Sequence, residues 1–241
     1  MKPDRRRQLL LALCASAVLL PASRSNAAAP RSFERIALHL EVDLVAGQAR
    51  EPIRSLLDMP AELVLAVESQ AALAEVDLVD ASDESVLGAR FTDTRALGVF
   101  ETELEFEAET LADLLREIPP GAYRVVGTAA DGARFQGAVE FAPELPGPFR
   151  LLSPPPGAQL GLEDVVFEWT PARGAAAYTL EIEDEDLGMT YETRLSPAQT
   201  FFQVPAAILT AGRSYDISLT VSGDTDDELE LETRIQTAPG G

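Results

Sequence analysis

The 241-residue chain is poor in the residues on which most catalysis and metal binding depend. It has one cysteine, one histidine and one lysine. A single cysteine excludes a disulfide scaffold and a Cys-ligated metal site, and most side-chain nucleophiles and nitrogen ligands are missing as well. Positive charge is also scarce, with 19 Lys and Arg against 40 Asp and Glu and a formal net charge of −21. Nucleic acid is therefore excluded as a partner, because phosphate backbones are bound by clustered Lys and Arg.

The first 29 residues have the three parts of a secretory signal peptide. Basic Lys2 and Arg5–Arg7 precede an apolar run, Leu9–Leu20, of 12 residues. That run is too short to span a membrane as a helix. Ser25-Asn26-Ala27 supplies a cleavage site of the small-x-small type. We therefore assign residues 1–29 to a signal peptide, predict cleavage after Ala27, and expect a periplasmic or secreted protein with no transmembrane segment in the mature chain.

Cleavage at this site leaves an even more acidic chain. Residues 28–241 hold 14 arginines, no lysine and 39 acidic residues, which gives a net charge of −25. Such a surface stays soluble in salt, where the Debye length falls to about 3 Å at about 1 M. A saline habitat and a merely acidic surface both remain open. General secretion and twin-arginine export also remain open, because Arg6-Arg7-Gln8-Leu9-Leu10 resembles the signal of the second route.

The N-terminal domain, residues 30–145, is predicted to be rich in β-strands. Hydrophobic residues make up 46% of the chain, enough for a packed core. In this region they mostly alternate with polar residues, most regularly over 36–44 and 100–107. A period of two is typical of antiparallel strands with one face buried and one face in water.

Three local signals complete this domain. Asp131-Gly132 lies between two alternating segments and predicts a hairpin with a type I′ turn. One short helix is predicted over 110–118, where Thr110 serves as the N-cap and apolar residues follow at helical spacing. Glycine and prolines between 45 and 60 predict a loop with a turn of helix.

A second β domain is predicted for residues 146–241. Pro143, Pro146 and Pro148 with Gly147 form a stiff linker in front of it. Seven alternating strands follow, with turns every 8–12 residues, which is the spacing of a β-sandwich. The predicted fold class is thus all-β, with two sandwich-like domains in tandem and one short helix in the first.

Four features of the second domain occur together in a known family. Trp169 matches a core tryptophan, Tyr178 follows a Gly-Ala-rich turn, Leu209–Tyr215 has the spacing of a tyrosine corner, and Gln236–Pro239 ends the domain. On these residues the segment 148–238 resembles a fibronectin type III domain. The resemblance implies an immunoglobulin-like sandwich with a buried tryptophan and loops that can bind partners, and it implies no particular function. The N-terminal part is similar to the partner domain of uncharacterised exported bacterial proteins.

The single histidine, His39, is the one residue that could serve as base in a Ser-His-Asp arrangement. It lies in mid-strand on the polar face that carries Glu41 and Asp43, not on a loop beside a pocket. The sequence also contains no Gly-x-Ser-x-Gly nucleophile motif. We predict that His39 is an ordinary histidine of a sheet surface.

Alternating glutamates on one predicted strand offer a different chemistry; they are Glu101, Glu103, Glu105 and Glu107. Two carboxylates about 5–9 Å apart can hydrolyse glycosides. A catalytic pair, however, needs unlike surroundings to separate its pKa values, and one exposed strand face gives all four the same surroundings. We predict a solvated face whose charge is partly balanced by arginines of a neighbouring strand, such as Arg124 or Arg134.

Two acidic stretches are candidates for binding Ca²⁺, which takes six to eight oxygen ligands. They contain Glu181, Glu183, Asp184, Glu185 and Asp186 in the first, and Asp224, Asp226, Asp227 and Glu228 in the second. Neither has the spacing of an EF-hand. The second stretch is the predicted metal site, with weak affinity for calcium, and a solvated acidic loop is the alternative for both. No other cofactor is expected.

These observations favour an exported, non-enzymatic binding or structural protein that presents loops on β-sandwich domains to a protein or cell-envelope partner. The competing hypothesis is a secreted hydrolase that uses a carboxylate pair in a cleft between the domains. The two differ in geometry, since a hydrolase needs a concave pocket with two inward carboxylates in unlike surroundings. A binding module would carry its carboxylates on open faces.

Overall fold

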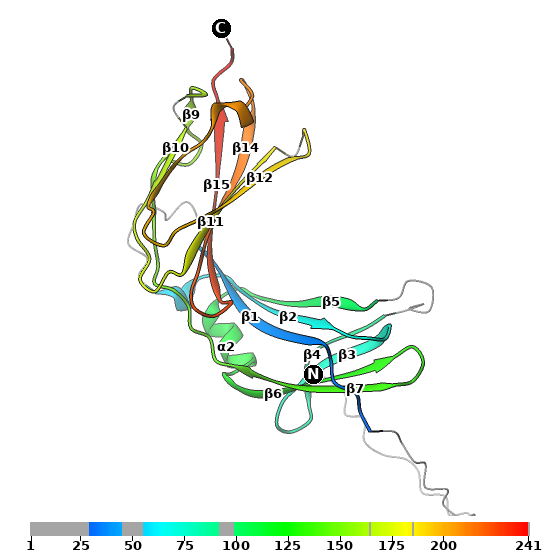
Figure 1. Ribbon diagram of the computed structural model, residues 1–241. Helices are drawn as coiled ribbons and strands as arrows, with labels where there is room; N and C mark the ends of the chain where they lie inside the picture. The colour runs from blue at the N-terminus through cyan, green and yellow to red at the C-terminus, as the bar shows by residue number, and fades with distance from the viewer. Residues whose placement is uncertain (1–28, 45–54, 92–98, 164, 185, 241) are drawn as a thin grey trace, which may run out of the picture.

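The computed structural model describes residues 29–44, 55–91, 99–163, 165–184 and 186–240. The predicted signal peptide, apart from its last residue, lies outside these ranges, as does most of the loop predicted between 45 and 60. In the described ranges the regular secondary structure is almost entirely β-strand (Figure 1). The fold class predicted from the sequence is confirmed: two sandwich-like units follow one another, and a short helix belongs to the first.

The described part of the N-terminal half has seven strands, one helix and one 3₁₀ turn. They are β1 (Arg35–Leu44), η2 (Leu56–Asp58), β2 (Ala61–Glu68), β3 (Leu73–Val79), β4 (Ser85–Arg90), β5 (Glu101–Ala108), α2 (Leu111–Glu117), β6 (Gly121–Ala129) and β7 (Arg134–Phe141). One sheet has the order β4-β3-β6-β7, and β1, β2 and β5 lie side by side in another. The helix begins at the predicted cap, because the Thr110 side chain accepts a hydrogen bond from the Asp113 backbone N–H.

Eight strands and a 3₁₀ turn make up the regular structure of the C-terminal half, as far as its residues are described. They are β8 (Leu151–Ser153), β9 (Gln159–Leu160), β10 (Val166–Trp169), β11 (Ala177–Asp184), β12 (Met189–Leu195), β13 (Phe201–Gln203), η3 (Ala206–Ile208), β14 (Ser214–Ser222) and β15 (Glu228–Thr237). A three-stranded sheet, β13-β10-β8, packs against a sheet with the order β12-β11-β14-β15. Trp169 and Tyr178 meet between the sheets with their ring centroids 5.4 Å apart.

The two halves share one sheet, which the sequence did not lead us to expect. Strand β1 pairs with β2 along most of its length, and its last four residues also pair in parallel with β15. The result is a continuous sheet with the order β12-β11-β14-β15-β1-β2-β5, with β9 attached to β15. In Figure 1 the strands of the two halves run in different directions, and β1 and β15 meet where the molecule bends.

The hairpin predicted around Asp131-Gly132 is present, but its predicted turn type is wrong. Strands β6 and β7 pair antiparallel up to Thr128 and Arg134, and the Ala129 N–H donates to the Ala133 carbonyl. Three residues therefore form the loop. Gly132 has φ of 86°, whereas Asp131 is not in the left-handed region, and a type I′ turn needs positive φ at both central residues.

The tryptophan core of the C-terminal half yields a direct test. Trp169 is 2% exposed and Tyr215 is completely buried, as the family resemblance implies. We expect Trp169→Ala to lower the free energy of unfolding by about 3–5 kcal/mol, because it removes a large buried aromatic side chain. Phe201→Ala is the control and should cost far less, since Phe201 is 60% exposed. Denaturant titration followed by circular dichroism measures both, and equal losses would contradict the assignment of the core.

Candidate functional site

The junction between β1 and β15 is the most distinctive place in the molecule. The register aligns Glu41 with Glu228, Val42 with Leu229, Asp43 with Glu230 and Leu44 with Leu231. The aliphatic members of these pairs are at most 3% exposed and belong to the core that runs through both halves. The acidic members point to the opposite face of the sheet, because side chains alternate along a strand.

A buried carboxylate stands at the start of this ladder. Asp227 is 5% exposed, and its Oδ1 accepts a hydrogen bond from the Leu40 backbone N–H at 2.9 Å. Its Oδ2 accepts from the Glu144 backbone N–H at 2.7 Å and from the Thr225 hydroxyl at 3.0 Å. The parallel pairing of β1 with β15 begins one residue later, at Glu41, so Leu40 lies just outside the ladder. The Asp227 side chain supplies the acceptor that the Leu40 N–H needs there. One side chain thus fixes β1, the linker and the β14–β15 loop to one another.

On its outward face the sheet carries carboxylates directly opposite one another. Glu228, Glu41, Glu62 and Glu107 form a row across β15, β1, β2 and β5. Like charges in directly opposed positions on neighbouring strands repel one another and destabilise the pairing. The junction is therefore held by apolar contacts on one face and opposed by charge on the other.

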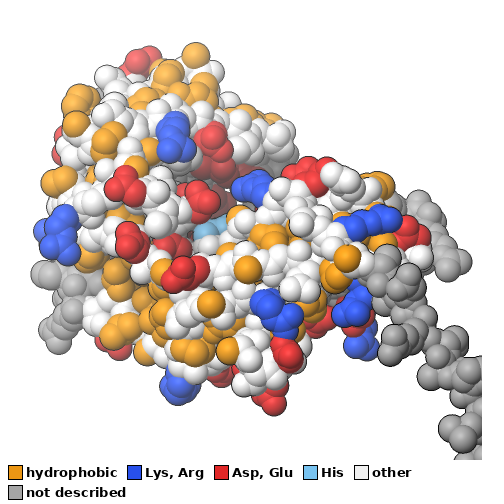
Figure 2. Space-filling view, turned by 60° about the horizontal axis from the view of Figure 1, so that its bottom comes forward, with side chains coloured by type: hydrophobic (Ala, Val, Ile, Leu, Met, Phe, Trp, Pro, Cys, Tyr) orange, Lys and Arg blue, Asp and Glu red, His pale blue; other side chains and the backbone are white. Residues whose placement is uncertain are grey.

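Burial and mutual repulsion change the acidity of this face. Burial is the main cause that raises the pKa of Asp43, Glu62, Glu228 and Glu230, and neighbouring carboxylates raise each of them further. The pKa of His39 is also raised, chiefly because Glu41 accepts a hydrogen bond from its ring at 3.1 Å. Figure 2 shows the pale blue histidine between the two lobes of the molecule, with carboxylates nearby.

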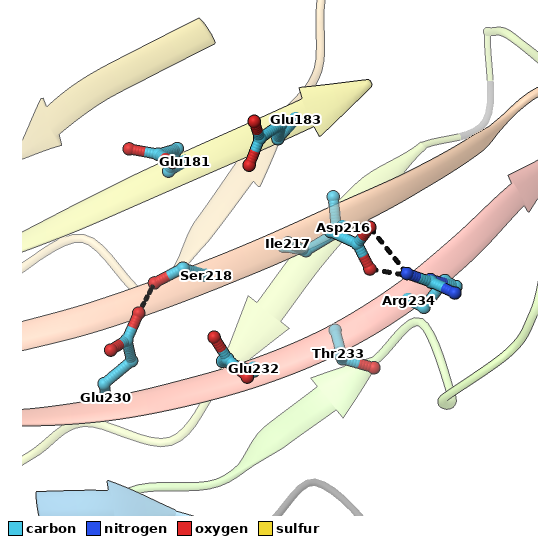
Figure 3. A pocket seen from close by; sticks show the side chains of 9 residues that line it. All are labelled: Glu181, Glu183, Asp216, Ile217, Ser218, Glu230, Glu232, Thr233 and Arg234. Atoms are coloured by element: carbon cyan, nitrogen blue, oxygen red, sulfur yellow. Dashed lines mark hydrogen bonds and ion pairs between the residues drawn. The ribbon is translucent and has the colours of Figure 1, made fainter. Parts of the chain in front are cut away.

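A shallow hollow of about 280 Å³ lies on the same face, over the C-terminal half (Figure 3). The polar side chains around it come from β11, β14 and β15; they are Glu181, Glu183, Asp216, Ser218, Glu230, Glu232, Thr233 and Arg234. Two interactions already occupy some of them: Arg234 binds both oxygens of Asp216 at 2.6 and 2.7 Å, and the Ser218 hydroxyl donates to Glu230. The hollow presents mostly hydrogen-bond acceptors, an arrangement suited to cationic groups.

The four residues predicted as calcium ligands have different environments. Asp224 and Asp226 are exposed on the loop, Asp227 is buried and bonded as described, and Glu228 begins β15 on its outward face. Within the described ranges, no three His, Cys, Asp or Glu side chains are grouped so that they could hold a metal ion. Calcium binding at this loop stays a prediction. Asp224 and Asp226 are the positions for testing it, because a substitution of Asp227 would also disrupt the junction.

The first acidic stretch also contains a buried aspartate that is held by hydrogen bonds. Asp184 is 2% exposed and receives two hydrogen bonds from the Arg213 guanidinium, at 2.8 and 2.5 Å, while Asp186 lies 3.3 Å from the same group. The hydrogen bonds from Arg213 lower the pKa of Asp184. Glu185 lies outside the described residues. Each stretch thus contributes one buried aspartate to the architecture, and a run of acids in the sequence does not reveal which one.

Other predicted candidates lie where the alternation placed them. His39 is on the polar face of β1 next to Glu41, and the glutamates of β5 at 101, 103, 105 and 107 are all exposed. The idea that Arg124 or Arg134 balances these glutamates is wrong. Both arginines belong to the sheet β4-β3-β6-β7, whereas β5 pairs with β2, and Arg124 binds Asp83.

Comparisons with known proteins identify no family for this chain. No family model matches the chain, and no curated protein matches it. Fibronectin(III)-like modules of Clostridium thermocellum CbhA are 14% identical, with 85% of this chain and 95% of that chain covered and a TM-score of 0.29. A two-domain fibronectin type III segment of chicken tenascin is 11% identical, with coverages of 72% and 91% and a TM-score of 0.30. The sandwich assignment therefore depends on the strand order itself. In the described part of the chain no helix is long and apolar enough to cross a membrane.

Removal of the Asp227 carboxylate should lower the free energy of unfolding of the protein. Asp227→Ala leaves the N–H groups of Leu40 and Glu144 without their acceptor, and the buried donor, that of Leu40, costs about 1–3 kcal/mol when it is left unsatisfied. Asp227→Asn should cost less, because its amide oxygen still accepts one of the two. Asp226→Ala is the matched control and should change the free energy of unfolding by less than about 0.5 kcal/mol. Urea titration measures all three, and a neutral Asp227→Ala would show that the junction does not depend on this side chain.

The acidic face predicts how stability depends on pH. A raised pKa means that the folded state binds protons more tightly than the unfolded state, so the free energy of unfolding rises as pH falls through the raised values. The raised pKa values of Asp43, Glu62, Glu228, Glu230 and His39 all act in this direction. We expect the melting temperature to increase from about pH 7 to about pH 5. The lowered pKa of Asp184 acts the other way only at lower pH, where that carboxylate takes up a proton.

Melting curves at constant ionic strength measure this dependence. Asp43→Asn with Glu230→Gln should flatten it, because both substitutions remove groups whose pKa is raised. A melting temperature that falls steadily from about pH 7 to about pH 5 would contradict the prediction.

Proposed function

We propose that this chain is an exported, non-catalytic binding or structural protein that presents the outward face of its shared sheet to a partner. The observation that carries the proposal is the β1–β15 ladder, which makes one continuous surface out of two sandwiches. The signal peptide predicted over residues 1–29 supports an extracellular or periplasmic location.

The partner that suits this surface carries positive charge. Carboxylates from β1, β2, β5, β11, β14 and β15 lie on the face, and the hollow over β11, β14 and β15 is lined mainly by acceptors. Complementary charge speeds association and selects partners, and it contributes less to raw affinity. A protein or cell-envelope component with clustered basic groups would therefore bind, and binding would weaken as salt is added.

The geometry supports the competing hydrolase less well. A catalytic pair requires one carboxylate with a raised pKa and one that stays ionised in a different environment. At the junction, burial and neighbouring carboxylates raise the pKa of Asp43, Glu62, Glu228 and Glu230 in the same way. These side chains also lie on the face of a sheet, which suits contact with a surface.

A pull-down with matched variants tests the proposal. The protein purified after export is immobilised and exposed to cell-envelope and extracellular fractions at low and high salt. Glu41→Gln/Glu230→Gln changes the junction, and Glu140→Gln/Glu168→Gln removes the same charge from exposed positions on β7 and β10, outside the shared sheet. A component retained by the wild type and the control but lost by the junction variant would support the proposal, whereas equal retention by all three would contradict it. Release of sugars from polysaccharides by the wild type, but not by the junction variant, would favour the hydrolase.

A further inference from the structure

The joint between the two halves is held by a short strand pairing and opposed by the repulsion of closely spaced carboxylates. Among the strand pairings that the structure describes, the β1–β15 ladder is the one that connects the halves, and it is four residues long. On the buried face of the ladder Val42 lies opposite Leu229, and Leu44 lies opposite Leu231. At the start of the ladder the Asp227 carboxylate accepts a hydrogen bond from the Leu40 N–H. Acidic pairs, Glu41 with Glu228 and Asp43 with Glu230, stand on its upper face.

Strands β2, β5 and β15 add further negative charge to that face. Strand β2 contributes Glu62, β5 contributes Glu105 and Glu107, and β15 continues with Glu232. Asp226 of the β14–β15 loop acts on His39 from the side. Among the described residues, two cationic side chains counter this charge: His39, which is bonded to Glu41, and Arg194 of β12, which acts on Glu228. Arg213 and Arg234 are engaged by Asp184 and Asp216, away from the ladder.

Repulsion of this kind depends on the salt concentration. Charges near the surface interact over a Debye length of about 10 Å at about 0.1 M, which equals about two strand spacings, and of about 3 Å at about 1 M, which is less than one strand spacing. The apolar contacts below the ladder do not share this dependence, since salt leaves burial intact or strengthens it.

We infer that the β1–β15 joint is a hinge regulated by ionic strength, firmly closed in concentrated salt and loosened in dilute salt, while each sandwich stays folded. This inference goes beyond the proposed function, because it concerns the relation between the two halves and not the identity of a partner. The shape of the continuous surface then depends on the salt concentration around the protein.

Distance measurements between the halves test the hinge. A Cys14→Ser background has no native cysteine. Ala138→Cys on β7 and Ala198→Cys after β12 then place one fluorophore on each half, at exposed and uncharged positions. Single-molecule energy transfer should give a narrow distance distribution at about 1 M NaCl that widens toward about 0.05 M. Far-ultraviolet circular dichroism at the same salt concentrations must stay constant, because the sandwiches remain folded.

Two double substitutions separate the joint from general charge effects. Glu41→Gln/Glu228→Gln should keep the distribution narrow at every salt concentration, because it removes the pair that faces across the ladder. Glu101→Gln/Glu103→Gln removes the same charge from the far end of β5 and should keep the salt response of the wild type. A wild-type distribution that does not change with salt would overturn the inference. An equal response of both variants, or a circular dichroism spectrum that is lost together with the distance, would also overturn it.

Discussion

The Asp227 carboxylate satisfies two backbone N–H groups that lie 104 residues apart in the sequence, at Leu40 and Glu144, and a hydroxyl on its own loop. A carboxylate suits this position because it only accepts hydrogen bonds, and bonds to an ionised acceptor are stronger than those between neutral groups. A neutral amide would turn a donor toward one of the two N–H groups. Strand β1 keeps its antiparallel pairing with β2 up to Val42 and adds the parallel ladder with β15 from Glu41, and this side chain serves the backbone where that ladder starts.

The shared sheet determines the character of the surface. In two sandwiches joined only by a linker, the acidic strands of each half would lie on separate faces in water. The ladder instead brings Glu41 next to Glu228 and Asp43 next to Glu230, so charge that the sequence distributes over distant segments accumulates at one place. The same ladder buries Val42, Leu44, Leu229 and Leu231, and this burial offsets the repulsion. The proposed binding surface and the buried contacts of the junction are therefore opposite faces of the same β1–β15 ladder.

Local pattern was enough to predict most strands, the helix cap at Thr110 and the burial of Trp169, because periodicity and capping act over a few residues. The junction could not be predicted in this way. Leu40–Leu44 and Asp227–Leu231 alternate in the same phase, but many strand pairs in this chain do so, and nothing local selects the parallel pairing of these two. Asp227 was predicted as a calcium ligand for the same reason. Acids in a loop look alike in sequence, and only the packing of β1 and the linker shows which one is buried.

The distribution of arginines argues that the charge at the junction is not simply a consequence of acidic composition. Elsewhere in the described ranges five arginines lie beside acids: Arg90 by Glu75, Arg116 by Asp113, Arg124 by Asp83, Arg213 by Asp184 and Arg234 by Asp216. At the ladder, a histidine and a more distant arginine face a row of carboxylates. A chain that needed a fixed junction in any medium would be stabilised by an arginine at position 41 or 230, where a neighbouring carboxylate is within reach. The repulsion that remains there costs stability, and such a cost is expected where a surface has to meet a cationic partner or respond to its surroundings.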